Sequence, residues 1–278
     1  MSIEEIIRNA LKEDLGDGDH TSLATIPENS TGRSKLLIRE TGILAGVDVA
    51  RQVYNLLDPE IFFDVVLHDG TPVNPGDIAF FVSGRSRSIL AGERLALNFM
   101  QRMSGIATAT AHLVNLIEGT GAKILDTRKT TPLLRELEKT AVRLGGGENH
   151  RMGLFDMIMI KDNHVDFAGG IRQVIEAVNG YLRLTDKKLK IEIEVRNFSE
   201  LQQVLDTGNI DRIMLDNFSA EDLAKAVKMI GGKYETEASG GIHAGNIRKY
   251  AETGVDFISV GALTHHINSL DMSLKAVI

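Results

Sequence analysis

Cationic side chains gather in one stretch of this chain, and their types suit the binding of a multiply charged anion. They are Arg128, Lys129, His150, Arg151 and Lys161. Each falls at or near the end of a segment with the pattern of a strand or a loop. The whole chain carries a formal net charge of −7. Cations gathered in a net-negative chain predict a pocket for an anionic ligand rather than a nucleic-acid surface.

The number of these cations indicates what the ligand carries. Arginine forks bind carboxylates and phosphates through two hydrogen bonds, and lysines add mobile point charge. Because one ion pair needs only one cation, this set predicts a ligand with several negative charges. The alternative is internal pairing with neighbouring acids, which are Asp126, Glu148, Asp156 and Asp162. A Schiff-base role for Lys129 or Lys161 is a second alternative, which the same carboxylates oppose because they favour the charged ammonium.

A scaffold must bring these distant positions together. Short apolar runs alternate with helical patterns along residues 123–126, 157–160, 191–195, 212–215, 234–238 and 257–260. Helix starts are expected at Ser199 and Ser219. Helix ends are expected at Gly208, Gly231 and Gly254. Repeated β-then-α units predict a parallel sheet covered by helices, closed or nearly closed into a barrel. A doubly wound open sheet is the structural alternative.

The earlier part of the chain has a different pattern. A capping box formed by Ser2 and Glu5 begins a first helix. Residues 32–81 alternate β-rich runs with turn residues and predict a small α/β domain. A helical pattern then runs from Gly92 to about Glu118, and we expect it to break near Ser104–Gly105.

In a barrel the chemistry gathers at the carboxyl ends of the strands. These ends carry, in order, Arg128 with Lys129, Lys161, Glu194, Asp216, Ser239-Gly240-Gly241 and Gly261. The last two ends are typical of a phosphate site, because glycine lets backbone N–H groups approach a phosphate and Ser239 adds a hydroxyl donor. Two tight turns are the simpler alternative.

The acids at the strand ends leave two questions open. Glu194 and Asp216 could hold ribose hydroxyls or a magnesium ion, since magnesium favours one or two carboxylates together with substrate phosphates. Glu192 lies two residues before Glu194 on the same face of its strand. Spacing alone therefore does not decide between these two glutamates.

Composition excludes several classes of function. The absence of cysteine excludes disulfides, thiolate metal sites and a cysteine nucleophile. The chain shows no apolar run long enough to cross a bilayer, and its first residues are too acidic for a signal peptide, so we expect a cytoplasmic protein. The absence of tryptophan argues against platforms that stack single-stranded nucleic acid.

Taken together, these motifs resemble those of the quinolinate phosphoribosyltransferase family. The matching segments are residues 13–22, 101–108, 127–132, 145–151, 161–164, 192–195, 215–218 and 237–242. They span nearly the whole chain in order. The resemblance implies an incomplete TIM-like α/β barrel over residues 105–278 and a smaller N-terminal α/β sandwich over residues 1–104, with the chain from about residue 265 able to pack back on the latter.

The resemblance also implies roles for particular residues. The anion pocket would be lined by Arg128, Lys129, His150, Arg151 and Lys161. Glu194 and Asp216 match the acids on the ribose side, and Ser239, Gly240, Gly241 and Gly261 match the phosphate loops. Lys129, Lys161, Glu194 and Asp216 would carry the catalysis. Arg102 matches an arginine that enters the neighbouring subunit's site in a homodimer, with a higher oligomer left open.

The reaction implied is phosphoribosyl transfer from phosphoribosyl pyrophosphate to quinolinate, a step of NAD biosynthesis that yields nicotinate mononucleotide, pyrophosphate and carbon dioxide. Magnesium would be held mainly by substrate phosphates, without a protein metal site. Two positions depart from the family pattern: Leu133, where glycine is usual, and Thr140, where tyrosine is common. The alternatives are a related barrel transferase acting on another acid and a non-catalytic ligand sensor.

Overall fold

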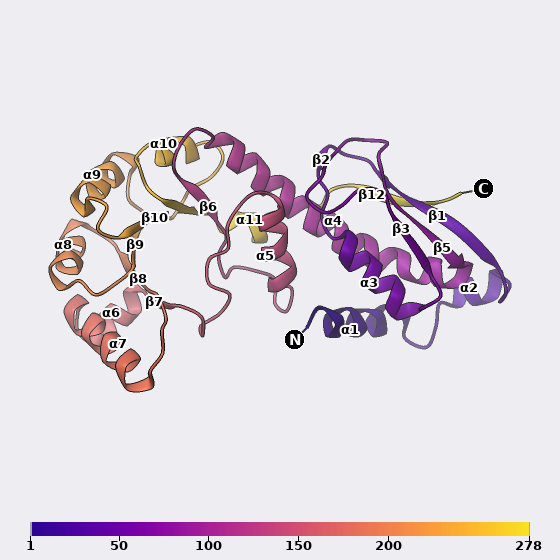
Figure 1. The fold of residues 1–278 in the computed structure, drawn as a ribbon, viewed down its shortest axis with the longest axis horizontal. Helices are drawn as coiled ribbons and strands as arrows, with labels where there is room; N and C mark the ends of the chain where they lie inside the picture. Colours follow the sequence, from indigo (N-terminus) through magenta and orange to yellow (C-terminus); the bar gives the residue numbers. More distant parts are fainter. Residues whose placement is uncertain (1, 278) are drawn as a thin grey trace. The chain divides into compact units, whose positions relative to one another are not determined.

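The computed structural model describes residues 2–277, which form two compact units (Figure 1). The first unit contains the chain up to Ala111, the segment Thr130–Gly146 and the chain from Leu263 onward. The second unit contains His112–Lys129 and Gly147–Ala262. The chain therefore crosses between the units several times, and the C-terminal segment belongs to the first unit.

The first unit is built on an antiparallel sheet with the strand order β12-β1-β5-β3. Its strands are β1 (Thr31–Ile38), β3 (Phe62–Val65), β5 (Ile78–Arg85) and β12 (Met272–Ala276). A short ladder joins β2 (Gly42–Ile43) to β4 (Pro72–Val73). Strand β12 comes from the end of the chain and pairs with β1, so the two ends of the sequence share one sheet.

Among residues 2–277, six helices contain residues of the first unit. They are α1 (Ile3–Leu15), α2 (His20–Thr25), α3 (Val47–Leu57), α4 (Ser86–Leu116), α5 (Arg135–Leu144) and α11 (Ala262–His265). The capping box predicted for α1 is confirmed: the Ser2 hydroxyl accepts from the Glu5 backbone, and the Glu5 carboxylate accepts from the Ser2 backbone. This box satisfies backbone donors that a helix start leaves open.

The break expected near Ser104–Gly105 was wrong, because α4 runs unbroken through it. The Ser104 hydroxyl accepts from the backbone N–H of Ala45 over 2.8 Å. A side chain at Gly105 would overlap the backbone carbonyl of Asn268. This pair therefore marks a place where other backbone segments of the first unit approach the helix closely, and not a helix end.

The second unit is an incomplete barrel, which confirms the fold predicted for this part of the chain. Its parallel strands have the order β6-β11-β10-β9-β8-β7, and they are β6 (Lys123–Leu125), β7 (Ile158–Ile160), β8 (Ile191–Val195), β9 (Arg212–Asp216), β10 (Glu235–Ser239) and β11 (Phe257–Ser259). Within the described residues β6 and β7 do not pair; Glu148 instead forms a parallel bridge with Leu125.

Helices cover the outer side of this curved sheet, as in a barrel and unlike a doubly wound sheet (Figure 1). They are α6 (Asp162–Ala168), α7 (Ile171–Thr185), α8 (Phe198–Thr207), α9 (Ala220–Ile230) and α10 (Ile247–Ala251). The predicted start of α9 at Ser219 and the predicted ends at Gly208 and Gly231 are confirmed. Helix α8 instead begins at Phe198, because the Asn197 side chain accepts from the Glu200 backbone over 3.0 Å.

Leu133, one of the departures from the family pattern, has a left-handed backbone with φ of 68° and a side chain that is 68% exposed. This conformation costs a residue with a Cβ roughly 1–2 kcal/mol, whereas glycine adopts it freely. We expect Leu133→Gly to raise the free energy of unfolding by about 1 kcal/mol in urea denaturation.

A matched control separates backbone strain from the loss of a leucine. Leu184, in the last turn of α7, is 90% exposed and has ordinary helical backbone. Leu184→Gly should lower the free energy of unfolding by roughly 0.5–1 kcal/mol. A loss of stability in both variants would contradict the strain at Leu133.

Candidate active site

The carboxyl ends of the barrel strands carry the residues that the sequence pointed to. Arg128 and Lys129 follow β6, Lys161 follows β7, and Gly261 follows β11. Glu194, Asp216 and Ser239 are the last or next-to-last residues of β8, β9 and β10. Since the strands are parallel and adjacent, these side chains share one edge of the second unit.

Two acidic side chains lie at this edge, Glu194 on β8 and Asp216 on β9. The Nζ atom of Lys161 is 3.5 Å from Oε2 of Glu194, and the Glu194 side chain is only 11% exposed. Burial raises the pKa of the Glu194 carboxyl, Lys161 lowers it, and the charges of Asp216 and Asp162 raise it. The edge therefore presents carboxylates that repel each other beside the Lys161 ammonium, which suits hydroxyl donors or a cationic reaction centre.

Two arginines of the site, Arg128 and Arg151, lie close enough for their charges to interact. Burial lowers the pKa of the Arg151 guanidinium, and the nearby charge of Arg128 lowers it further. One Arg151 nitrogen, Nη1, donates to the Met157 carbonyl over 3.3 Å. Two guanidinium groups held close enough to repel each other favour a ligand with two negative groups.

The acids considered as internal partners for these cations also have other roles. Glu148 pairs with Lys123 over 2.7 Å. Asp156 accepts from the backbone N–H groups of Met152 and Gly153 over 2.7 and 2.8 Å. These bonds shape the loop that precedes β7.

Buried Asp126 holds the segment that carries His150 and Arg151. Its Oδ1 accepts from the His150 backbone over 2.9 Å, and its Oδ2 accepts from the Asn149 side chain over 2.5 Å. The bridge between Glu148 and Leu125 aligns the same segment along β6. The positions of His150 and Arg151 are thus set by contacts with Leu125 and Asp126, at the end of the strand that also leads to Arg128.

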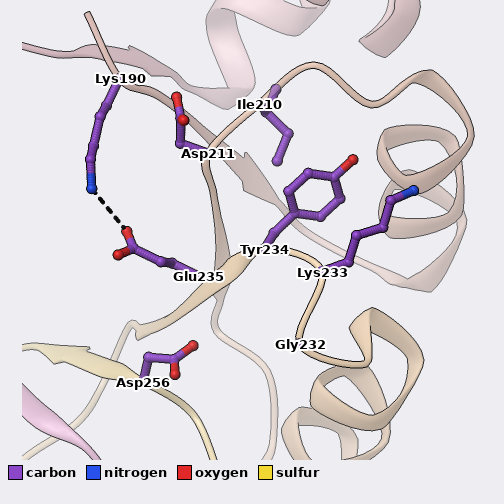
Figure 2. A pocket seen from close by; sticks show the side chains of 8 residues that line it. All are labelled: Lys190, Ile210, Asp211, Gly232, Lys233, Tyr234, Glu235 and Asp256. Carbon is purple, nitrogen blue, oxygen red and sulfur yellow. Dashed lines mark ion pairs between the residues drawn. The ribbon is translucent and has the colours of Figure 1, made fainter.

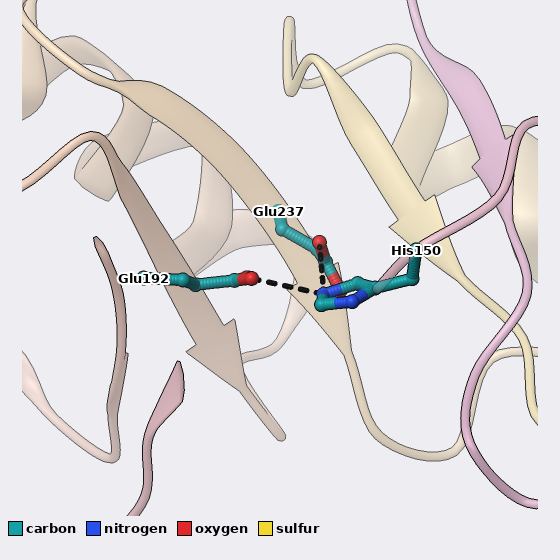
Figure 3. A group of neighbouring side chains, drawn as sticks. All are labelled: His150, Glu192 and Glu237. Atoms are coloured by element: carbon teal, nitrogen blue, oxygen red, sulfur yellow. Dashed lines mark ion pairs between the residues drawn. The ribbon is translucent and has the colours of Figure 1, made fainter. Parts of the chain in front are cut away.

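His150 lies deeper than the other predicted residues. Its ring is buried against two carboxylates from the barrel interior, Glu192 on β8 and Glu237 on β10 (Figure 3). Nε2 of His150 is 2.9 Å from Oε2 of Glu192 and 3.5 Å from Oε2 of Glu237. The structure thereby separates the two glutamates of β8: Glu194 contacts Lys161 near the strand end, and Glu192 belongs to the interior.

The interior carboxyls hold their protons more tightly than usual. Burial raises the pKa of Glu192 to about 7, against the lowering effect of Arg212. Burial and the charge of Glu192 raise the pKa of Glu237 to about 8. At neutral pH this pair therefore does not carry two full negative charges.

These shifts predict how stability depends on pH. Because both pKa values rise on folding, the folded protein keeps protons that the unfolded chain has released. The free energy of unfolding should therefore fall as pH rises from about 4.5 towards 8, and this contribution should level off above that range. In Glu237→Gln the fall should be shallower, as measured by urea denaturation at several pH values.

The control for this prediction is Glu235→Gln, two residues earlier on β10, which removes a carboxylate whose side chain is 39% exposed. It should change the slope little, because the charge of Glu235 raises the pKa of Glu192 far less than burial does. An unchanged slope in Glu237→Gln would contradict the assignment of the slope to the buried pair.

The predicted phosphate loop has backbone that only glycine adopts easily. Gly240 and Gly241 follow Ser239 with φ of 93° and 62°. The Ser239 carbonyl accepts from the Asn217 backbone over 2.8 Å. A Cβ at Gly240 would overlap the Asn217 side chain and lie 2.9 Å from its backbone nitrogen. The loop after β10 is thus packed tightly on the loop after β9.

Arg102 lies in the first unit, on α4. Its Nε and Nη2 atoms donate to Oε1 of the buried Glu138 over 2.9 and 2.6 Å. Nη2 also donates to the Thr131 hydroxyl over 2.7 Å and to the Thr264 carbonyl over 3.2 Å. These bonds fix the guanidinium between α5 and the chain segment that follows β11.

A pocket of about 490 Å³ lies at the other end of the barrel strands (Figure 2). Its lining residues immediately precede or begin β8, β9, β10 and β11, and they are Lys190, Ile210, Asp211, Gly232, Lys233, Tyr234, Glu235 and Asp256. Asp211 accepts from the Ile191 backbone over 2.6 Å, and Asp256 from the Thr236 backbone over 2.8 Å. These hydrogen bonds tie neighbouring strands together at their amino-terminal ends. The site residues predicted at the strand ends lie at the opposite, carboxyl ends of the barrel strands.

Sequence reasoning overlooked Glu237 and its partner Arg212. Arg212 Nη1 lies 3.1 Å from Oε2 of Glu237, and both side chains are buried. The sequence did carry a signal for them: each is a charged residue within a predicted strand, at a position where the alternation of side chains along the strand directs it into the barrel.

No helix among residues 2–277 is long and apolar enough to cross a membrane.

Comparison with known proteins places the whole chain among described relatives. Residues 106–275 match the family described as "Quinolinate phosphoribosyl transferase, C-terminal domain", and residues 19–104 match the corresponding N-terminal domain. A quinolinate phosphoribosyltransferase (decarboxylating) of Nicotiana tabacum is 42% identical over 98% of this chain and 82% of its own length. A probable nicotinate-nucleotide pyrophosphorylase (carboxylating) of Bacillus subtilis is 38% identical over 100% of this chain and 94% of its own.

A solved structure supports the same grouping. The nicotinate-nucleotide pyrophosphorylase from Francisella tularensis superimposes with a TM-score of 0.93 and 42% identity, covering 99% of this chain and 96% of that one. Similarity of this extent covers every strand end described above.

Proposed function

The chain belongs to the quinolinate phosphoribosyltransferase family, and on that premise we propose that it is a pentosyltransferase of NAD biosynthesis. It transfers the phosphoribosyl group of phosphoribosyl pyrophosphate to the ring nitrogen of quinolinate. The products are nicotinate mononucleotide, pyrophosphate and carbon dioxide, as in a nicotinate-nucleotide diphosphorylase of the carboxylating class.

The observation that carries this proposal is the pair of mutually repelling arginines, Arg128 and Arg151, at the edge that also holds Lys129 and Lys161. Quinolinate is a dianion, and its two carboxylates match two guanidinium forks. Phosphoribosyl pyrophosphate is a polyanion and needs further cations. The negative charges of these two substrates together match the positive charges at the strand ends.

The chemistry follows from where charge develops. When pyrophosphate leaves, positive charge builds at the sugar carbon and negative charge builds on the leaving group. In this proposal Glu194 and Asp216 hold ribose hydroxyls near the positive centre, and Lys129 and Lys161 stabilise the pyrophosphate. Ser239, Gly240, Gly241 and Gly261 bind the 5′-phosphate through backbone N–H groups and the serine hydroxyl.

The loss of carbon dioxide needs no additional group. Attack by the ring nitrogen on the sugar carbon makes a pyridinium ion. When the bond to the adjacent carboxylate breaks, its electron pair remains on the ring carbon next to the positive nitrogen, and a proton then takes the place of carbon dioxide. The enzyme therefore has to orient the carboxylate rather than supply a decarboxylation cofactor.

Magnesium fits this site as a companion of the substrate. Glu194 is already in contact with Lys161, so the acids at the strand ends do not form a protein-only cage. The ion would be held mainly by pyrophosphate oxygens and water, and it would neutralise charge on the leaving group.

We also propose a cytoplasmic homodimer with shared active sites, in which Arg102 reaches the partner's site. Support comes from the family motif around Arg102; the absence of cysteine removes any need for an oxidising compartment. Because removal of Arg102 would strand the buried Glu138 carboxylate, the better variant is Arg102→Lys, which keeps a cation there.

Complementation tests the shared site. Arg102→Lys and Lys161→Ala should each be weakly active alone, and the mixed dimer should regain activity because one of its two sites is intact. Pyrophosphate release before and after subunit exchange measures the gain. No gain despite exchange shown by differently tagged subunits would contradict sharing.

Acid selectivity tests the proposed function itself. With magnesium and phosphoribosyl pyrophosphate, quinolinate should support rapid pyrophosphate release and nicotinate very little. A preference for nicotinate would overturn the substrate while keeping the transferase. Binding of both substrates without pyrophosphate release would instead indicate a sensor, and inactivity with both acids a transferase for another acid.

A further inference from the structure

The hydrogen bonds of the His150 imidazole define its tautomer. The backbone N–H of Arg151 donates to Nδ1 of His150 over 2.7 Å. Nδ1 therefore carries a lone pair, and we assign the ring proton to Nε2. Nε2 lies close to Oε2 of both Glu192 and Glu237 without pointing squarely at either. The ring thus presents Nε2 to both carboxyl groups at contact distance.

The same three side chains could in principle bind a metal ion, since one ligand atom from each lies within 4.8 Å of the others. The tautomer opposes this, because a neutral histidine coordinates through a nitrogen lone pair and here Nε2 carries the proton. The Arg212 guanidinium also lies 3.1 Å from Oε2 of Glu237 and would repel a second cation. The cluster suits an imidazole N–H better than a metal.

The two carboxyl groups are otherwise poorly satisfied. Both oxygens of Glu192 and Oε1 of Glu237 are buried without a well-aligned hydrogen bond from the described residues. Buried polar groups of this kind are costly and call for a functional explanation. Burial raises the pKa of both groups, which leaves the pair with a net charge that Arg212 can balance.

The ring is connected directly to the anion pocket. His150 and Arg151 are consecutive, and Arg151 is held near Arg128 against their mutual repulsion. Asp126 fixes the backbone on one side of this pair through the His150 N–H. The interior carboxyls contact the ring of the same residue (Figure 3).

We propose that Glu192 and Glu237 are positioning residues for the anion pocket: they hold the imidazole of His150 inside the barrel and so fix the backbone from which Arg151 reaches the ligand. Neither carboxylate touches substrate in this arrangement. The role rests on the proposed reaction, in which Arg151 binds a carboxylate of quinolinate.

The test compares two substitutions at Glu192, the nearer carboxylate. Glu192→Leu removes the acceptor, whereas Glu192→Gln keeps an acceptor oxygen and the shape. We expect Glu192→Leu to raise the KM for quinolinate roughly 10- to 100-fold, by analogy with the loss when a partner that orients a metal-binding histidine is removed. The KM for phosphoribosyl pyrophosphate should stay within about twofold, and Glu192→Gln should restore most of the loss.

Two further comparisons separate positioning from general damage. In a His150→Ala background, Glu192→Leu should cause no additional rise in the KM for quinolinate, because its effect passes through His150. Glu235→Gln, on the same strand as Glu237, should leave both KM values unchanged. A wild-type KM in Glu192→Leu, or an equal extra loss in the His150→Ala background, would overturn the proposal.

A measurement on the unmodified protein keeps the proposal testable if Glu192→Leu does not fold. The ¹⁵N chemical shifts of the His150 ring at neutral pH should show a proton on Nε2 and a bare Nδ1. A proton on Nδ1 would overturn the assignment. This reading needs no turnover, so it is independent of whether quinolinate proves to be the substrate.

Discussion

Lys161→Ala should lower kcat by roughly 100- to 1,000-fold, the effect typical of losing one group aimed at developing charge in a closed site. Lys161 contacts Glu194 at 3.5 Å and lies at the edge where pyrophosphate would leave. Without the ammonium, the negative charge of the leaving group loses a stabilising partner. Glu194 also loses the cation that favours its ionised form. Steady-state pyrophosphate release measures the change.

A second Lys–Glu pair in the same barrel provides the matched control. Lys190 lies 3.6 Å from Glu235 at the opposite ends of the strands. Lys190→Ala removes the same charge at nearly the same contact distance, and it should leave kcat unchanged. Lys129→Ala should behave like Lys161→Ala. Unchanged kinetics in both Lys129→Ala and Lys161→Ala would contradict the pocket assignment.

Gly240→Ala is the second substitution from which we expect a large effect. The added methyl would meet the side chain and backbone nitrogen of Asn217, at a backbone φ of 93° that alanine rarely adopts. The loop must shift, and its N–H groups would leave the 5′-phosphate. We expect the KM for phosphoribosyl pyrophosphate to rise at least roughly tenfold, as for a lost charge-assisted contact of 1.4 kcal/mol or more.

The control here is Gly232→Ala, at the amino-terminal end of β10. Gly232 also has positive φ, 72°, but a methyl group there meets nothing within 4 Å. It should cost roughly 1 kcal/mol of stability and leave the KM unchanged. If the two variants had the same KM for phosphoribosyl pyrophosphate, the loop after β10 would not be the phosphate site.

The barrel could be predicted because its signals are local. Short apolar runs and the Ser219 and Gly231 caps act within a few residues, and they agree with the strands and helices observed. The expected break in α4 failed because the role of Gly105 depends on a distant segment, Asn268, that packs against it. The start of α8 was misplaced because Asn197 caps as well as serine does.

The candidate site also contains residues that could be predicted from the sequence and contacts that could not. The strand-end rule located Lys161 and Glu194, since parallel strands bring their ends to one edge whatever their details. The rule could not find the contact between Glu237 and His150, which depends on how far each side chain reaches into the barrel. Nor could it show that Arg102 bonds the buried Glu138, a contact between separate helices of the first unit. Long-range packing decides both.

The most direct measurement of the central claim is the ratio of two products. The protein is incubated with magnesium, phosphoribosyl pyrophosphate and quinolinate labelled in its 2-carboxyl group, and pyrophosphate and labelled carbon dioxide are followed together. We predict equal amounts of both at every time, none without phosphoribosyl pyrophosphate, and parallel losses in Lys161→Ala. Pyrophosphate release without carbon dioxide would contradict the account.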